Sequence, residues 1–421
     1  MDTFLQDVRF SIRQLRRSPG FAASAILTLA LGIGANATIF TWMQALVLDP
    51  LPAVPDSRQL HGFQWKTPEG NRNSFSWPDF VDYRQRNSTL SGLAVMRMTP
   101  MSLGTGSQPE RVWGMLTSSN YFDVAGLPMA RGRAFRMDEE MNLGAAPVAV
   151  ISHALWRDRF QSDPGLVGRT IQLNGRAFEV IGIAPEGFHG TTLGLKFDIF
   201  VPIGMRSAFL PGTDKIFTLR GSNWLDAIAR LKPGVPLSQA EADLTAISAQ
   251  LAREHYNSGR YKRAEITPVW RYGAGKILAP VMLLMMAVVG VVLLIACANV
   301  ANLLLARAAG RRREIAIRLA LGVNRGRLIR QLLAESLILA LAGGVFAFLM
   351  ARLTAGLMIT FLPPNDLPMN FHAPVNWTVA GFILAVAALA SVIFGLAPAI
   401  RASRPDVVTA LKDESGASAG A

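Results

Sequence analysis

The sequence has a single cysteine, Cys297, among its 421 residues, and charged residues make up only 17% of the chain. One thiol cannot form an internal disulfide, so every folded part of the chain has to be held together by its own core. Cys297 lies inside an apolar run, which is typical of a small packing residue. Soluble globular chains carry roughly a quarter of charged residues, so the low charge predicts that part of this chain lies in a membrane.

The sequence also lacks the linear motifs of common catalytic and metal sites. It contains no G-x-x-x-x-G-K-[ST] phosphate-binding loop, no H-E-x-x-H pair, no Cys/His cluster and no G-x-S-x-G nucleophile pattern. We interpret the five scattered histidines as surface or hydrogen-bonded residues rather than metal ligands. The adjacent acids Glu139 and Glu140 are interpreted as solvated loop residues. The sequence therefore predicts a chain that is not an enzyme and binds no cofactor or metal of its own.

Four apolar runs are long enough to cross a bilayer, because a helix needs about 20 residues to span the hydrocarbon core. The runs are Phe21–Leu48, Ile277–Ala306, Leu332–Leu362 and Trp377–Ile400. The first run is longer than the apolar region of a signal peptide, which has roughly 7–15 residues, and no small-residue cleavage site follows it. We therefore expect it to be a retained membrane helix.

The basic residues predict which side of the membrane each segment faces. Residues 1–20 carry four arginines against two aspartates, and residues 307–330 carry eight arginines against one acid. Arg401 and Arg404 follow the last apolar run. With four crossings these three segments share one side, and the positive-inside rule makes that side cytoplasmic. This topology accounts for the net charge of +13, so we expect no nucleic-acid binding.

The expected fold class is a multi-pass membrane protein with four transmembrane α-helices and a large extracytoplasmic mixed α+β domain between helices one and two. The first segment is either an amphipathic helix in the headgroup plane or a plain basic flank. The expected order is a cytoplasmic amphipathic segment (1–20), transmembrane helix 1 (21–48), the extracytoplasmic domain (49–276), transmembrane helix 2 (277–306), a cytoplasmic loop or helix (307–330), transmembrane helix 3 (331–362), a short outer loop (363–376), transmembrane helix 4 (377–400) and a cytoplasmic tail or linker (401–421).

The extracytoplasmic segment shows local signals of both strands and helices. A strand followed by a helix is expected at Val148–Phe160, and a hairpin at Thr170–Pro185, where an Asn-Gly pair supplies a two-residue turn. A helix is expected at Leu237–His255, capped by Ser238 with Glu241 three residues on. The Gly/Pro-rich region Thr191–Asp214 is a candidate boundary between two lobes.

Polar and small residues inside the apolar runs are interpreted as contacts between helices. Small residues such as Gly32 let membrane helices approach closely, and Asn36 can hydrogen-bond a neighbour. Asn299 and Asn302 share a face of the second run near its inner end, and Glu335 and Ser336 lie one turn into the third. These positions lie near one membrane interface rather than at the midplane, which disfavours an ion or proton pathway.

The arginine-dense loop carries a pattern of its own. Glu314 and Arg318 form an i,i+4 pair in the favourable order. Ile315 and Leu319 share one face of the same helical stretch, and Leu321 flanks that face. The pattern predicts a short helix at the membrane surface with a few apolar residues to dock. The alternative is a basic anchor that binds anionic lipid.

Several long strings, in a consistent order, resemble the FtsX-like and MacB-type permeases of ABC transporters. That family's signature is similar to RRREIAIRLALGVNRGRLIRQLLAESLILALAGG (Arg311–Gly344). Its periplasmic core domain and C-terminal end resemble Ser119–Phe135, Val148–Phe188 and Phe394–Lys412. The opening, Asp7–Phe40, resembles the duplicated orphan permease subgroup, whose members usually carry two such halves in one chain. This chain has one half and ends in DESGASAGA, which looks like a linker, so we expect a truncated or independently encoded half.

The resemblance implies a permease subunit of an ABC transporter in the bacterial inner membrane, with both termini in the cytoplasm. Such a subunit relays ATP-driven motion to its periplasmic domain, for export or extraction of a substrate that the sequence does not identify. The ATPase is implied to be a separate cytoplasmic chain that binds the ATP. The residues implied to couple to it are Arg311, Arg312, Arg313, Glu314, Ile315, Arg318, Leu319, Leu321 and Gly322.

The resemblance leaves the partners and one alternative function open. Family members work as dimers, so the partner is a second copy or a second permease half. A periplasmic partner protein also fits the family. The same relay could instead switch a periplasmic cell-wall hydrolase without transport, as FtsX-like relatives do. A membrane-anchored scaffold without any ATPase is the remaining alternative.

Overall fold

The computed structural model of the chain describes residues 11–49, 51, 53–67, 70–72, 74–104, 109–141, 143–256, 263–273, 275–309, 325–354 and 375–402. The chain forms two compact units, which are described separately. The first, the membrane unit, consists of Met1–Gln44, Pro280–Pro363 and His372–Ala421, and the second, the sheet unit, consists of Ala45–Ala279 and Pro364–Phe371.

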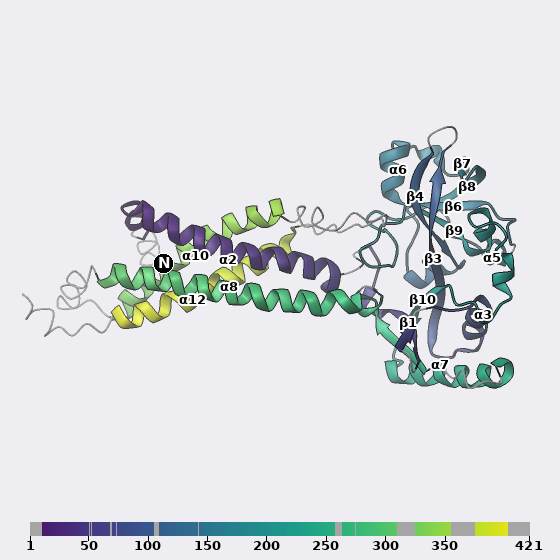
Figure 1. Cartoon of the computed structure of the whole chain (residues 1–421). Coiled ribbons are helices and arrows are strands. Elements are labelled where there is room, and N and C mark those ends of the chain that lie inside the picture. Colours follow the sequence, from purple (N-terminus) through teal and green to yellow (C-terminus); the bar gives the residue numbers. More distant parts are fainter. Residues whose placement is uncertain are drawn as a thin grey trace, which may run out of the picture. The chain divides into compact units, whose positions relative to one another are not determined.

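Four helices of the described chain are long and apolar enough to cross a membrane, which confirms the predicted number of spans. Figure 1 labels them α2, α8, α10 and α12. They are α2 (Pro19–Met43), continued by the π-helical η1 (Gln44–Leu48), α8 (Gly275–Ala309), α10 (Arg325–Thr354) and α12 (Trp377–Ala402). Residues 11–16 form a further helical segment that ends just before α2. Pro19 occupies the first turn of α2, where its missing N–H costs nothing.

Small residues bring the membrane helices into close contact. A Cβ at Gly343 of α10 would lie 2.9 Å from the Cβ of Leu29 in α2, so only glycine fits there. Asn36 of α2 donates from Nδ2 to the carbonyl oxygen of Val289 in α8 at 2.8 Å. Cys297 is 2% exposed within the apolar core of this unit. These contacts confirm the predicted packing roles of Asn36 and Cys297.

The sheet unit is built on one mixed sheet, in which β3 pairs with β10 and β4 at its centre. The strand order is β11-β1-β10-β3-β4-β9-β6-β8-β5, with β2 beside β1 and β7 beside β3 and β8. Most neighbours are antiparallel, and β4–β9 and β6–β8 are parallel. The strands are β1 (Leu60–Thr67), β2 (Gly70–Arg72), β3 (Leu90–Leu103), β4 (Glu110–Thr117), β5 (Arg131–Gly132), β6 (Val148–Ile151), β7 (Thr170–Leu173), β8 (Arg176–Ile183), β9 (Ile199–Pro202), β10 (Asp226–Leu231) and β11 (Arg263–Pro268).

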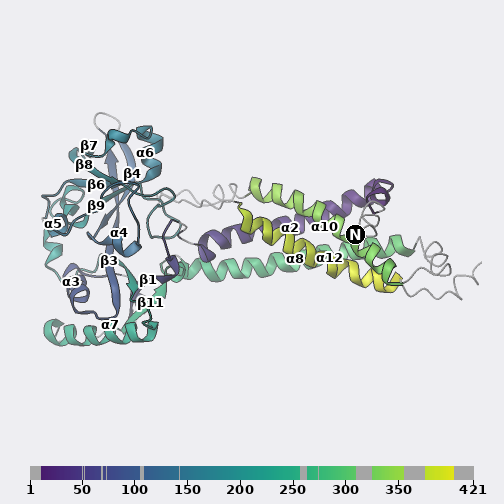
Figure 2. The same cartoon turned by 180° about the vertical axis from the view of Figure 1, so that it is seen from behind.

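Helices cover this sheet from its two faces (Figures 1 and 2). One apolar core includes residues of α3, α6 and α7. The other apolar core includes Tyr121 and Phe122 of α4 with Phe188 and Phe200. The helices are α3 (Trp77–Arg86), α4 (Tyr121–Ala125), α5 (Met137–Met141), α6 (His153–Phe160) and α7 (Leu237–Leu251), with short segments η2 (Ser57–Gln59), η3 (Pro164–Leu166), η4 (Ile203–Ala208), η5 (Asp214–Phe217), η6 (Ala252–Tyr256) and η7 (Val269–Arg271).

The sheet confirms two of the local predictions and corrects two others. β6 leads into α6, and β7 and β8 form the expected hairpin around Asn174 and Gly175, both with positive φ. The proposed lobe boundary is wrong, because β9 lies inside that region and joins β4 to β6 in one continuous sheet. Ser238 is not an N-cap, since α7 already begins at Leu237. Its expected partner Glu241 instead accepts the N–H of Ile266 at 3.0 Å.

Candidate functional site

The predicted docking segment falls in a part of the chain that the structure does not describe. Arg311, Arg312, Arg313, Glu314, Ile315, Arg318, Leu319, Leu321 and Gly322 all lie outside the described residues. The description ends with α8 at Ala309 and resumes with α10 at Arg325. The candidate site is therefore built from the two helix ends that flank this segment.

Arg307 lies in the last turn of α8 and contacts three other parts of the membrane unit. Its Nη1 donates to Oε1 of Glu335 in α10 at 2.7 Å. Its Nη2 donates to the carbonyl oxygen of Gln14 at 3.2 Å and to the hydroxyl of Ser18. Its Cζ lies 4.6 Å from the ring centre of Phe21. We call these five residues the arginine clamp.

The arginine clamp is a buried charged contact. The side chains of Arg307 and Glu335 are 14% and 9% exposed. A charge in apolar surroundings is costly unless an opposite charge and hydrogen bonds compensate it, and both conditions are met here. The clamp therefore joins the last turn of α8 to Glu335, ten residues after the start of α10, and to the residues around the start of α2.

The pairing within the clamp is absent from the sequence-based predictions. In the sequence analysis, Arg307 is one of eight arginines in a loop. Glu335 is interpreted there as a polar residue between helices, without a named partner. The available signal is that a lone acid in an apolar helix needs a cation. Arg307 is separated from Glu335 by 28 positions, and no short-range pattern links residues so far apart.

Three other polar positions of the spans differ in their environment. Ser336 contacts Ser391 of α12 through their hydroxyl oxygens at 3.3 Å, as expected for an interhelical contact. Asn299 and Asn302 are exposed on α8, and neither amide has a hydrogen bond with the described residues. Their predicted contact with another helix of this chain is therefore not present in the described structure.

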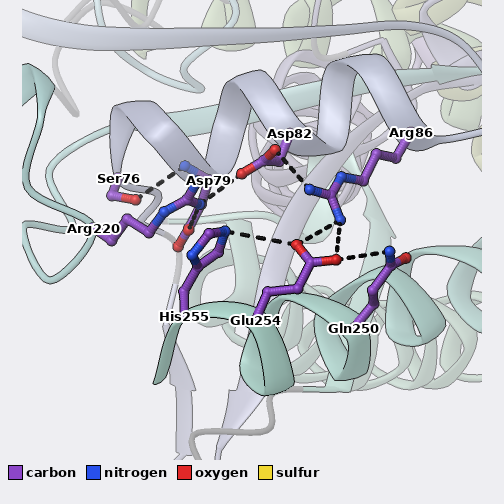
Figure 3. Close-up of polar contacts among 8 residues, drawn as sticks. All are labelled: Ser76, Asp79, Asp82, Arg86, Arg220, Gln250, Glu254 and His255. Carbon is purple, nitrogen blue, oxygen red and sulfur yellow. Dashed lines mark hydrogen bonds and ion pairs between the residues drawn. The ribbon is translucent and has the colours of Figure 1, made fainter. Parts of the chain in front are cut away.

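A network of ion pairs joins α3 to the end of α7 and to the loop before β10 (Figure 3). Asp82 of α3 contacts Arg220 at 2.6 Å and Arg86 at 3.2 Å. Arg86 in turn contacts Glu254 at 2.9 Å. Arg220 also contacts Asp79 at 3.0 Å. Every acid in this network has a cation, so the network is a structural tie between elements rather than a catalytic group.

Glu139 and Glu140 correct the prediction of solvated loop acids. Both lie in α5, where they are 8% and 1% exposed. Arg133 contacts Glu139 at 2.6 Å and lowers its pKa against the opposing effect of burial. Arg84 contacts Glu140 at 2.9 Å. Partners contributed by other segments allow this burial.

The described residues also contain no group of three or more His, Cys, Asp or Glu side chains that could hold a metal ion.

Two family models match the chain over most of its length. The MacB-like periplasmic core domain matches residues 22–247, and the FtsX-like permease C-terminal part matches residues 286–407. The first match alone covers more than half of the chain. The chain therefore belongs to the FtsX/MacB-type permeases, a class of ABC-transporter permease. Most of its sheet unit, without β11, falls in the core-domain match, and most of α8 with α10 and α12 falls in the permease match.

The chain is also similar to curated relatives and to solved structures. The macrolide export ATP-binding/permease proteins MacB of Escherichia coli K12 and Shigella flexneri are each 27% identical over 303 residues, covering 70% of this chain and 43% of theirs. The chain thus spans less than half the length of these relatives. The periplasmic region of MacB from Actinobacillus actinomycetemcomitans is 15% identical, with a TM-score of 0.39, over 56% of this chain and 96% of its own. The extracellular domain of the ABC-type transporter YknZ from Gram-positive bacteria is 16% identical, with a TM-score of 0.36, over 49% of this chain and 99% of its own.

Proposed function

We propose that this chain relays ATP-driven motion from a separate cytoplasmic ATPase to its extracytoplasmic domain, for export or extraction of a substrate. In this proposal ATP is bound by the partner chain. Residues 311–322 form the docking element, and both termini lie in the cytoplasm of a bacterium, with the spans in its inner membrane. Export is favoured over control of a cell-wall hydrolase because the curated relatives are named as export proteins.

The arginine clamp is the observation that carries this proposal. A docking element can move membrane helices only if the helix ends beside it are mechanically joined. Arg307 supplies that joint, since it links the end of α8 to α10 and to the residues before α2. A basic segment that only binds anionic lipid would not require a buried arginine at its base that hydrogen-bonds two other segments. The clamp therefore favours the docking interpretation over the lipid anchor.

The docking proposal predicts that charges on the apolar face of residues 311–322 abolish binding of the ATPase. Ile315→Asp with Leu319→Asp places two carboxylates on the expected contact face, and burying them unpaired is strongly unfavourable. We expect at least a tenfold loss of co-purified ATPase. Ala316→Asp with Ala320→Asp adds the same charge at the same spacing on the neighbouring face, so this control should retain binding. Equal recovery of ATPase with both pairs would refute the docking role.

We infer that α8 pairs with a second permease chain. The most apolar stretch of α8 is 17% buried in the described structure, against 39–50% for the other three spans. Asn299 and Asn302 lie on its exposed surface. An amide facing lipid leaves its donors and acceptors without partners, which is unfavourable in a bilayer. A second α8, or the matching helix of a second permease half, would supply hydrogen-bond partners for both residues.

The pairing proposal predicts disulfide capture at this face. In a Cys297→Ser background, Asn299→Cys should form a covalent dimer in membranes under mild oxidation. The control is Leu389→Cys, because Leu389 of α12 is 60% exposed and lies on another helix. Its product should remain monomeric on a non-reducing gel. A dimer from Leu389→Cys with none from Asn299→Cys would move the interface away from α8.

A further inference from the structure

Arg206 is a buried arginine with no acid beside it among the residues that the structure describes. It lies in η4 and is 8% exposed as a whole residue. Its Nε is fully buried without a hydrogen-bond partner. None of its three guanidinium nitrogens has a hydrogen bond or ion pair with the described residues. Arginine stays charged at any ordinary pH, so a positive charge is enclosed in this region without a compensating anion.

A rigid aromatic platform fixes the orientation of this guanidinium. The Cζ of Arg206 lies 4.2 Å from the ring centre of Trp224. Trp224 is 7% exposed, and its backbone N–H donates to the carbonyl oxygen of Phe75 at 2.9 Å. The ring of Phe217 meets it edge-on at 5.6 Å. The cation–π contact orients the planar group but does not neutralise its charge.

Arg97 adds a positive charge near Arg206, and Arg97 also interacts with the carboxylate of Asp226. Burial and, after it, the charge of Arg97 lower the pKa of Arg206. Arg97 lies on β3 between Met96 and Met98, and it alternates with Met96 across the sheet. Asp226 pairs with Met96 and shares a sheet face with Ile228, which belongs to the core opposite that of Trp224. Asp226 therefore lies on the other face and is not a partner for Arg206.

The open edge of the guanidinium indicates what could bind it. Nε is the one nitrogen of Arg206 that is both fully buried and unpaired. Nη1 and Nη2 also lack partners in the described chain, so they keep contact with solvent. Two parallel N–H donors on one edge of a planar cation match the two oxygens of a carboxylate. Stacking on Trp224 leaves that edge free.

We propose that Arg206 and Trp224 form a binding site for a carboxylate group on the extracytoplasmic domain. Arg206 donates from Nη1 and Nη2 to the two carboxylate oxygens, Trp224 holds the guanidinium plane, and Arg97 adds a second positive charge. The site takes a ligand or a partner side chain that presents a free carboxylate. This proposal does not depend on how the permease is coupled to an ATPase.

Acetate is the probe, with the full chain purified in detergent and the melting temperature as the readout. Sodium acetate should raise the melting temperature of the wild type above that in sodium chloride at equal ionic strength. With a dissociation constant of roughly 1 mM, the shift should become measurable above about 1 mM acetate and keep growing with the acetate concentration, because stabilisation follows RT ln(1 + [L]/Kd). Arg206→Gln should abolish the difference between acetate and chloride. Arg206→Lys should weaken the response at least tenfold, because an ammonium group cannot form the two-pronged contact.

The control is Arg271→Gln, which removes an exposed arginine stacked on Trp270 at 5.3 Å. Its acetate response should equal that of the wild type. If Arg206→Gln does not fold, Arg206→Lys and Trp224→Phe provide the same test, since both keep the bulk of the site. Equal acetate responses in the wild type and Arg206→Lys would overturn the proposal. A response to inorganic phosphate without one to acetate would overturn the carboxylate assignment.

Discussion

Replacing Arg307 with methionine is expected to destabilise the membrane unit by about 3–5 kcal/mol, the usual cost of removing one partner of a buried ion pair. Methionine fills a similar volume, so the loss reflects the charge and hydrogen bonds rather than a cavity. Glu335 would remain, 9% exposed, without a cation. The ends of α8 and α10 would lose their direct link.

A double substitution separates the stability of the clamp from its role in coupling. Arg307→Met with Glu335→Met removes both charges, and replacing a buried pair with apolar residues is often neutral or stabilising. We expect its melting temperature in lipid nanodiscs to return close to that of the wild type. Stimulation of the partner ATPase by the permease should nevertheless remain low, because the hydrogen bonds to Gln14 and Ser18 are also lost.

The control for this series is Arg352→Met, which removes an exposed arginine of α10. Its effect on the melting temperature should be small, since exposed charges contribute little. Two results would contradict the proposed role of the arginine clamp in stability and coupling. One is a single Arg307→Met variant as stable as the wild type, and the other is a double variant that is stable and fully stimulated.

The parts of the structure that sequence predicted well depend on local physics. Four apolar runs predicted four membrane helices because each run must remove its own backbone and side chains from water. The Asn174-Gly175 turn was predictable because few residue pairs tolerate two successive positive φ angles. In both cases the signal lies within a few residues, and no distant partner is needed to interpret it.

The parts that sequence did not predict depend on partners far away in the chain. Glu140 is buried because Arg84, 56 positions earlier, supplies its cation. Ser238 fits a capping pattern, yet its Glu241 is held by β11 instead. Arg206 belongs to a segment predicted as a lobe boundary, and only the folded sheet unit shows that it is buried without an acid. Burial and charge pairing between distant segments were therefore the missing information.

The second large effect is expected from Gly62→Ala in β1, at about 3 kcal/mol, comparable to the loss of a packed aromatic ring. A Cβ at Gly62 would lie 2.0 Å from Cγ and 2.1 Å from Cδ2 of Tyr272. These atoms are at the root of the ring, so a small rotation cannot clear them. Gly62 cannot retreat either, because it pairs with Ile228 on one side and Thr267 on the other. The tyrosine ring has to leave.

The pH dependence of stability that Asp226 causes should show whether the ring of Tyr272 is displaced. Burial raises the pKa of Asp226 from its ordinary value of 3.8 to about 6, and its charge raises the pKa of Tyr272 in turn. A folded-state pKa above the unfolded value means that the folded protein binds more protons between these two pH values. The stability of the wild type should therefore fall as pH rises from about 4 to about 6. Hydration of Asp226 in Gly62→Ala should flatten this dependence.

Melting temperatures between pH 4 and 7.5 measure both effects. Gly221→Ala is the matched control, because a Cβ there meets nothing within 4 Å, and it should show the wild-type pH dependence. Tyr272→Ala combined with Gly62→Ala should cost less than the sum of the two single changes, since the clash needs both side chains. Tyr272 lies three positions before α8 begins at Gly275. Loss of this contact should therefore also lower stimulation of the partner ATPase by the permease, if α8 carries motion into the sheet unit. Additive costs with unchanged stimulation would exclude Tyr272 from that relay.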